Sequence, residues 1–458
     1  MASETRPHGS HGSHDARAAH ARAAHGRATT TRRRTLLAVT AVAAVLIAAT
    51  GAVAPVSAEQ IKQKEFRRMN PEIMGQGGSY TAMAQGYSAL FTNPAGFAFT
   101  DKPELTLPSV TLWAHSRPDL LLSTLGAFSG DASDTTADGE EKSQEDLIID
   151  ALREQFTTNG FGVGAAFGTG YIRHGIGLGL EAAFDTYLYG PTFPLGLEGE
   201  INSRLALVVG YAHPFYLGPV KLALGGALRP TIRITSFVDS DTAADQITKL
   251  TGIDTGETTD TESGGLFDTL TALNGWGVAF DTGLIAAYRG VRVGVQARNL
   301  FNTQMDYSNN SFQELIDAAA AGGLPAKPEN QADPSYVSDN YVLPAEISFG
   351  AAWNPVLGKY SQVFDPKIHA QITDPFKMTD QDPEKARSFW TRLHFGTELT
   401  FLNFFDLRFG LNQGYFTAGT GLDLGFLEIQ YAIYSQEYGR YPGDQQVGGA
   451  ALEFAFRF

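Results

Sequence analysis

Apolar and polar side chains alternate along most of the chain from Glu104 to the last residue, Phe458. In the stretch Val291–Arg298 (VRVGVQAR) the odd positions are valine or alanine, and the even positions are arginine, glycine or glutamine. Leu393–Phe401 and Leu407–Asn412 follow the same rule, with charged side chains on one face only. Since successive side chains of a β-strand point to opposite faces, this period of two predicts strands with one apolar and one polar face.

The lengths of these stretches separate a membrane barrel from a soluble β-sandwich, which would also alternate. Several reach nine residues or more, enough for a tilted membrane crossing of about 9 to 11 residues, whereas a globular strand usually has about 5 or 6. Short turns such as Tyr288–Gly290 join some pairs, and long polar loops join others: Gly130–Gln144, Asp239–Ser263 and Thr303–Asn340. This asymmetry predicts an all-β fold, an antiparallel transmembrane β-barrel.

We count roughly fourteen to sixteen candidate strands, with weak ones near Leu120 and Leu195. Within the long loops, a helical spacing of apolar residues predicts short helices at Gln144–Phe156 and Phe312–Ala321. These helices either pack at the barrel mouth or decorate the surface without a role in transport. The mean hydropathy of −0.13 is too low for a bundle of membrane-spanning helices.

Residues 1–58 differ from the rest and predict an export signal. Arg32–Arg34 precedes an apolar run, Leu36–Val53, and the small side chains of Val56–Ala58 suit cleavage by signal peptidase near Ala58. An uncleaved helical anchor is the alternative, and the His-rich residues before Arg32 are either a loose leader or an over-extended start. Without these residues, which carry seven Arg against Glu4 and Asp15, the net charge changes from −15 to −20 (−15 minus +5). This acidic balance argues against nucleic-acid binding.

The stretch Gly75–Phe99 (GQGGSYTAMAQGYSALFTNPAGFAF) fits neither a regular helix nor a regular strand. Pro94 fixes its own φ and biases Asn93 toward an extended conformation, which frees the Asn93 side chain to hydrogen-bond nearby backbone. Backbone freedom at one end and a fixed turn at the other suit a plug that fills a lumen and yields to a ligand. We therefore interpret residues 59–103 as a hatch and residues 104–458 as the barrel. The hatch motif comprises Gly75, Gly77, Gly78, Asn93, Pro94, Ala95 and Gly96.

This motif resembles the N-terminal hatch of the FadL family of outer-membrane hydrophobic-compound transporters, in which a glycine-rich stretch leads into Asn-Pro-Ala just before the first strand. Further similarity lies in Val293–Phe301, Leu343–Ala352 and Leu407–Tyr434. The resemblance implies about 14 strands, a hatch inside the lumen, and passive uptake of long-chain fatty acids or other hydrophobic compounds. Related barrels similar to the PorV type do not transport, so a scaffold or secretion-shuttle barrel is the alternative function.

Apolar hatch residues are candidates for a ligand path, with packing of the plug as the alternative role: Met83, Leu90, Phe91, Phe97 and Phe99. Charged residues on the polar strand faces are expected to contact the plug: Arg229, Arg233, Arg292, Arg298, Arg408, Asp281, Glu346, Glu398, Asp406, Glu428 and Glu453. The last strand, Gly448–Phe458, ends on an aromatic, which resembles the signal that the barrel-assembly machinery recognises. The expected partners are that machinery, outer-membrane lipid and a hydrophobic small molecule in the bacterial outer membrane.

Motifs for catalysis or cofactor binding were sought and not found. No G-x-S-x-G or H-E-x-x-H occurs, and without cysteine there are no disulfides and no thiolate chemistry. Gly177–Ala182 matches the dinucleotide fingerprint in form, but it lies within an alternating run, and we interpret it as a strand whose inward face needs small side chains. The acidic residues between Asp239 and Glu262 lack EF-hand spacing and predict a solvated loop. We predict no enzymatic activity, no cofactor and no metal.

Overall fold

The computed structural model describes residues 61–62, 66–129, 142–190, 198–238, 271–311, 341–376 and 388–458. The predicted export signal, the candidate strand near Leu195, the candidate helix at Phe312–Ala321 and the acidic loop lie outside these residues. The described residues include no helix long and apolar enough to span a membrane.

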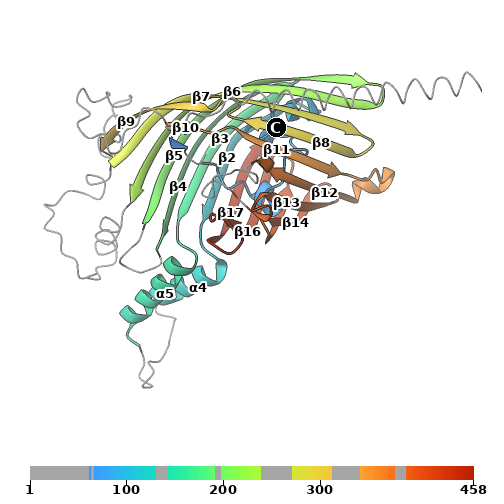
Figure 1. The fold of residues 1–458 in the computed structure, drawn as a ribbon. Helices are drawn as coiled ribbons and strands as arrows, with labels where there is room; N and C mark the ends of the chain where they lie inside the picture. The colour runs from blue at the N-terminus through green and yellow to red at the C-terminus, as the bar shows by residue number, and fades with distance from the viewer. Residues whose placement is uncertain are drawn as a thin grey trace, which may run out of the picture. The chain divides into compact units, whose positions relative to one another are not determined.

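Fourteen strands form a closed antiparallel β-barrel (Figure 1). Two pairings join strands that are not consecutive in the chain. Strand β8 pairs with β11, and the last strand, β17, pairs with the first ring strand, β2, which closes the ring. The predicted all-β barrel fold is therefore confirmed. In ring order the strands are β2 (Glu104–Ala114), β3 (Val163–Arg173), β4 (Ile176–Tyr189), β5 (Glu198–Leu217), β6 (Val220–Val238), β7 (Thr271–Tyr288), β8 (Val291–Arg298), β11 (Glu346–Trp353), β12 (Phe364–Thr373), β13 (Leu393–Phe401), β14 (Phe405–Asn412), β15 (Tyr415–Asp423), β16 (Leu427–Glu437) and β17 (Gln446–Arg457).

Three short strands extend the sheet beside the ring: β1 (Ile61–Lys62), β9 (Thr303–Ser311) and β10 (Tyr341–Leu343). The start of β7, Thr271–Trp276, pairs with β9, whereas its end pairs with β8. Strand β10 lies between β9 and the parallel strand β1. The prediction of a loop from Thr303 onward was wrong at its start. Strand β9 does alternate, with Met305 and Tyr307 buried on one face, but the polar run that follows them hides the pattern in the sequence.

The helices are short and lie between the strands. They are α2 (Pro71–Gly75), α3 (Gly86–Leu90), α4 (Pro118–Ser129), α5 (Gln144–Thr158), and the 3-10 turns η1 (Pro94–Phe99), η2 (Gly358–Gln362) and η4 (Trp390–Arg392). The helix predicted from Gln144 is confirmed as α5, which Ser143 caps by accepting a hydrogen bond from the Asp146 backbone N–H. The candidate strand near Leu120 was wrong. It is helix α4, which begins at Pro118 and carries Asp119 in its first turn, both favourable at a helix start.

The two faces of the ring carry opposite chemistry, as the alternation predicts. Leu224 and Leu228 of β6 are about half exposed, while Ala223 and Arg229 on the other face are buried. The same contrast recurs around the ring, with large apolar side chains exposed at Leu112, Phe167, Val209, Val293, Phe395 and Leu411. An outward apolar face is what lipid requires of a membrane barrel, and the inward face is left to enclose a polar lumen.

Candidate functional site

Residues 66–99, which we name the lumen segment, lie inside the ring and contact strands around it. Helix α2 packs against β14, β15, β16 and β17, helix α3 against β2, β3 and β4, and η1 against β4, β6 and β7. Gly75 and Gly77 approach the wall at β15 and β14, and Ala82 approaches it at β8 and β11. The segment therefore spans the lumen from one side of the barrel to the other.

The turn at Asn93 is fixed both to the segment and to the wall. Asn93 is extended (φ −92°, ψ 110°), as expected before a proline, and its side-chain Oδ1 accepts a hydrogen bond from the Ala95 N–H at 3.1 Å. Its Nδ2 donates to the Thr81 carbonyl at 2.9 Å and to the Val295 carbonyl of β8 at 3.2 Å. Asn93 is fully buried, so these bonds are made without competition from bulk water.

The glycines of the hatch motif permit close approach and unusual backbone geometry. Gly77 and Gly78 have φ of 75° and 76°, a left-handed region that other residues rarely adopt. Gly75 faces Gly419 of β15, and a Cβ on Gly96 would lie 2.5 Å from the Ala84 carbonyl oxygen. These positions accept no side chain without movement of backbone. Their role in a movable hatch stays a prediction.

Many of the wall positions that the lumen segment touches are glycine. A Cβ added to Gly294 would lie 2.7 Å from the Thr81 carbonyl oxygen, and one on Gly283 would overlap the Asn93 side chain. We name these wall positions the glycine seat. At each of them an added Cβ would come within 3.1 Å of a segment atom. They are Gly168, Gly170, Gly177, Gly179, Gly210, Gly225, Gly283, Gly294, Gly350, Gly396, Gly410 and Gly419.

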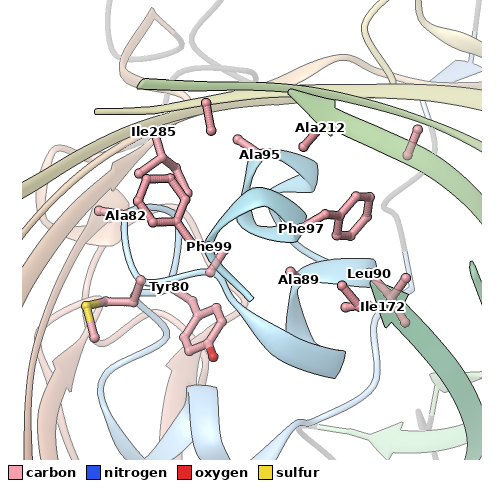
Figure 2. Close-up of a cluster of buried hydrophobic side chains, with 14 of the residues drawn as sticks. Tyr80, Ala82, Ala89, Leu90, Ala95, Phe97, Phe99, Ile172, Ala212 and Ile285 are labelled. Atoms are coloured by element: carbon pink, nitrogen blue, oxygen red, sulfur yellow. The ribbon is translucent and has the colours of Figure 1, made fainter. Parts of the chain in front are cut away.

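Four of the apolar candidates for a ligand path lie in one cluster of buried hydrophobic side chains, of which Figure 2 labels Leu90, Phe97 and Phe99, and two of them pack against this seat. The Phe97 ring lies between Gly177 and Gly210, and Leu90 lies against Gly170 and Gly179. The prediction that the inward face of Gly177–Ala182 needs small side chains is thus confirmed at Gly177 and Gly179. Met83 and Phe99 are also buried in the cluster, and Phe91 is partly buried beside it. Whether these five residues form a ligand path stays a prediction.

A cavity of about 670 Å³ lies against the lumen segment. Of the apolar path candidates only Phe91 lines this cavity, which we name the chamber. Most of the residues that line it are polar or charged, and apolar side chains line the rest. The cations are Arg67, Arg68, Arg204, Arg233, Arg298 and Arg392, the carboxylates are Glu181, Asp185, Glu200, Glu346, Asp374 and Glu437, and the apolar side chains include Phe66, Met69, Ile73 and Met74.

Tyr80 and Tyr438 line the chamber outside the strands. Tyr438, in the connection from β16 to β17, is packed beside the ring of Tyr187. Burial raises the pKa of Tyr438 well above its ordinary value, so its hydroxyl stays neutral. A neutral hydroxyl of this kind both donates and accepts hydrogen bonds. The described residues hold no cluster of side chains arranged to bind a metal.

Several of the charged residues predicted to face the lumen do contact the segment. Arg298 donates to the Phe91 carbonyl, Arg292 donates to Gln85 Oε1 at 3.3 Å, and Glu346 pairs with Arg67 at 2.7 Å. Others pair within the wall instead: Arg229 with Asp281 at 2.9 Å, and Arg408 with Glu398 at 2.7 Å. Residues that the sequence analysis missed are Arg67, Arg68, Glu181 and Arg204. Glu181 and Arg204 lie on alternating strands, and their positions on the polar face of each strand would have predicted that they face the lumen.

Replacing Asn93 and Pro94 together by alanine should leave the barrel assembled but loosen the lumen segment. The change removes both Asn93 Nδ2 bonds, and the loss of a hydrogen bond costs about 0.5 to 1.5 kcal/mol for each bond. We expect the permeability of reconstituted liposomes to small sugars to rise by about tenfold or more. Heat-modifiable gel migration is the control for assembly, and a double variant as tight as the parent would contradict this role for the turn.

No family model and no curated protein sequence matches the chain. Among solved structures it is similar to the toluene transporter TodX of P. putida, with 12% identity over 84% of this chain and 97% of that chain and a TM-score of 0.44. It is similar to the toluene transporter TbuX of Ralstonia pickettii, with 14% identity, coverage of 85% and 97%, and a TM-score of 0.44. These structures belong to the FadL family of outer-membrane hydrophobic transporters, the family that the glycine-rich stretch and the Asn-Pro-Ala turn resemble.

Proposed function

We propose that this protein is a bacterial outer-membrane transporter for passive uptake of hydrophobic compounds, with long-chain fatty acids as the ligand. The observation that carries the proposal is a closed barrel whose lumen is filled by a non-covalently held segment, with a chamber of about 670 Å³ against it. A fixed pore would need no filling segment, and a barrel without transport would need no chamber. On this proposal the chain reaches the outer membrane after cleavage near Ala58.

The chemistry of the chamber favours a fatty acid over a pure hydrocarbon. A hydrocarbon that enters must displace water from arginine and carboxylate groups and return no hydrogen bonds, which is costly. A fatty acid supplies a carboxylate for the polar lining and an alkyl chain for Phe66, Met69, Ile73 and Phe91. Toluene, the compound named for TodX and TbuX, is therefore a useful comparison ligand.

We place the exit at the side of the barrel where β10 adjoins the ring. The chain departs from the ring after β8 at Asn299 and Asn302, which have φ of 49° and 58°. Strand β10 pairs with β9 and β1 and is followed in the strand order by β11, which pairs with β8. A ligand in the chamber reaches this point past Pro344 and Thr373, which line it. Movement of the lumen segment would let the ligand leave sideways.

Uptake of labelled long-chain fatty acid by cells that lack the gene tests the proposal. We expect uptake to fall severalfold and to return when the gene is supplied in trans, with a smaller change for labelled toluene. The energy comes from the concentration gradient or from consumption inside, so the purified protein should need no nucleotide. Unchanged fatty acid uptake would contradict the proposal.

A scaffold or secretion-shuttle barrel is the second candidate function, and one observation favours it. Helix α4 exposes Leu122, Leu125 and Phe128, which are spaced three residues apart and so share one helix face. An exposed apolar helix face suits a protein partner. Co-purification of a partner in equal amount, together with unchanged uptake, would support this second function.

A further inference from the structure

The start of the lumen segment is joined to the wall by two consecutive arginines. Residues 66–99 contain only three charged residues, Arg67, Arg68 and Glu72. Glu72 accepts hydrogen bonds from Tyr80 and Ser88 of the segment itself, at 3.0 and 2.7 Å. Arg67 pairs with Glu346 of β11, whereas Arg68 reaches β2, β4 and β17 on another part of the ring. The two arginines therefore contact different parts of the ring.

Arg68 is the buried member of this pair. Its Nε lies 3.2 Å from Glu181 Oε2 of β4, and its Nη1 lies 4.0 Å from Glu453 Oε1 of β17 and 3.4 Å from Ser109 Oγ. Its side chain is 5% exposed, whereas the Arg67 side chain is 41% exposed. The guanidinium also lies over the rings of Tyr87 and Phe91, at 5.1 and 5.5 Å. These rings belong to the lumen segment. Arg68 therefore connects three strands of the wall to the aromatic side chains packed inside the segment.

Arg68 belongs to a cluster of paired arginines and glutamates. Glu181 also pairs with Arg204, which donates to the Phe66 carbonyl at 2.9 Å. Glu453 accepts from Ser109 at 2.6 Å and lies 3.7 Å from Arg457, which pairs in turn with Glu428. The cluster thus holds three cations and three carboxylates. Without Arg68 one buried carboxylate charge is left uncompensated, which is strongly unfavourable in a site of low dielectric.

We propose that Arg68 is the positioning residue that locks the lumen segment in its closed position, and that an anionic head group in the chamber releases it. This inference rests on the proposed function. Arg68 lines the chamber, so a carboxylate that arrives there can take the guanidinium as a partner in place of Glu181. The bond that closes the lumen is then exchanged for a bond to the ligand. A hydrophobic compound without a charge offers no such exchange.

Permeability of liposomes that contain the purified full-length barrel tests the lock. We expect Arg68→Ala to raise the permeability to small sugars by about tenfold or more, because it breaks a buried pair. Arg68→Lys, which keeps the charge but not the fork of donors, should lie between Arg68→Ala and the parent. Arg67→Ala is the matched control: its pair with Glu346 is partly exposed, and we expect a change of less than about threefold.

The release step is tested with a fatty acid and its methyl ester, which share a chain and differ in charge. The acid should raise the permeability of the parent, the ester should not, and Arg68→Ala should be equally permeable with either compound. Protein-free liposomes correct for direct effects of the acid on lipid. If acid and ester act equally on the parent, the release step is overturned.

The lock and the proposed function fail in different ways. Suppose that the Arg68→Ala variant has the same sugar permeability as the parent, and that deletion of residues 75–99 raises this permeability. That result overturns the lock but still supports closure of the lumen by the segment. A tight deletion variant instead overturns closure by the segment, on which the proposed function depends. If Arg68→Ala forms no heat-modifiable barrel, Arg68→Lys decides: a raised permeability supports the lock, and a value equal to the parent's overturns it.

Discussion

Deleting residues 75–99 should convert the closed barrel into an open pore, with conductance higher by orders of magnitude than that of the parent. Barrels of about eight strands fill their interior with side chains, but a ring of 14 strands encloses a wider lumen. At twelve positions against the segment the wall has glycine and contributes no side chain to fill this lumen. Ion conductance of the purified variant in planar bilayers measures the effect.

The deletion should leave the ring itself intact. Strand pairing and the outward apolar face do not depend on residues 75–99, so we expect heat-modifiable migration and a β-rich circular dichroism spectrum in both proteins. An assembled variant with the conductance of the parent would show that the segment is not a hatch. That outcome would also remove the main support for transport.

Replacing Gly225 by valine should open the pore, whereas the same change at Gly226 should leave it closed. These neighbours on β6 point to opposite faces. A Cβ on Gly225 would lie 2.5 Å from the carbonyl carbon of Pro94 and 2.6 Å from its oxygen, whereas one on Gly226 would meet nothing closer than the Phe280 ring at 3.6 Å. Since backbone atoms cannot rotate away, the Asn93–Gly96 turn must leave its seat.

The expected size of this effect follows from the cost of overpacking, about 1 to 3 kcal/mol. If the closed state alone is destabilised, the ratio of open to closed protein rises roughly 5- to 150-fold. Sugar permeability measures this ratio, and Gly226→Val controls for loss of glycine from the same strand. Equal permeability of the two variants would contradict direct packing of the Asn93–Gly96 turn against β6.

The ring of strands could be predicted from the sequence because lipid imposes a simple rule on each strand. The alternation in Val291–Arg298 marks β8 from purely local information, and Gly448–Phe458 marks β17 in the same way. Alternation predicts less well the elements that lie outside the ring of strands. Strand β9 has only Met305 and Tyr307 to mark its buried face, and the apolar run at Leu120–Leu122 does not alternate and belongs to helix α4.

The site was harder to predict, because its parts meet only in three dimensions. The turn at Asn93 and Pro94 is a local feature, and its conformation follows from the proline. The glycine seat is not local: Gly225 and Gly283 carry no hydropathy signal and acquire a role only from the segment that lies against them. Arg68 precedes the glycine-rich stretch, and its partners Glu181 and Glu453 are more than 100 and 380 residues away in sequence.

The pairing of β17 with β2 constrains the order in which the protein can assemble. This seam joins the first and last strands, and Leu105 and Phe458 exchange two backbone hydrogen bonds of 2.9 Å at its end. The lumen segment immediately precedes β2, so it must be inside the curling sheet before the seam seals, since threading it afterwards would require unfolding. Arg68 binds carboxylates on both sides of this seam, on β17 and on β4. The lumen segment therefore also connects the strands on the two sides of this seam. We expect the segment to enter the lumen in the same step in which β17 pairs with β2.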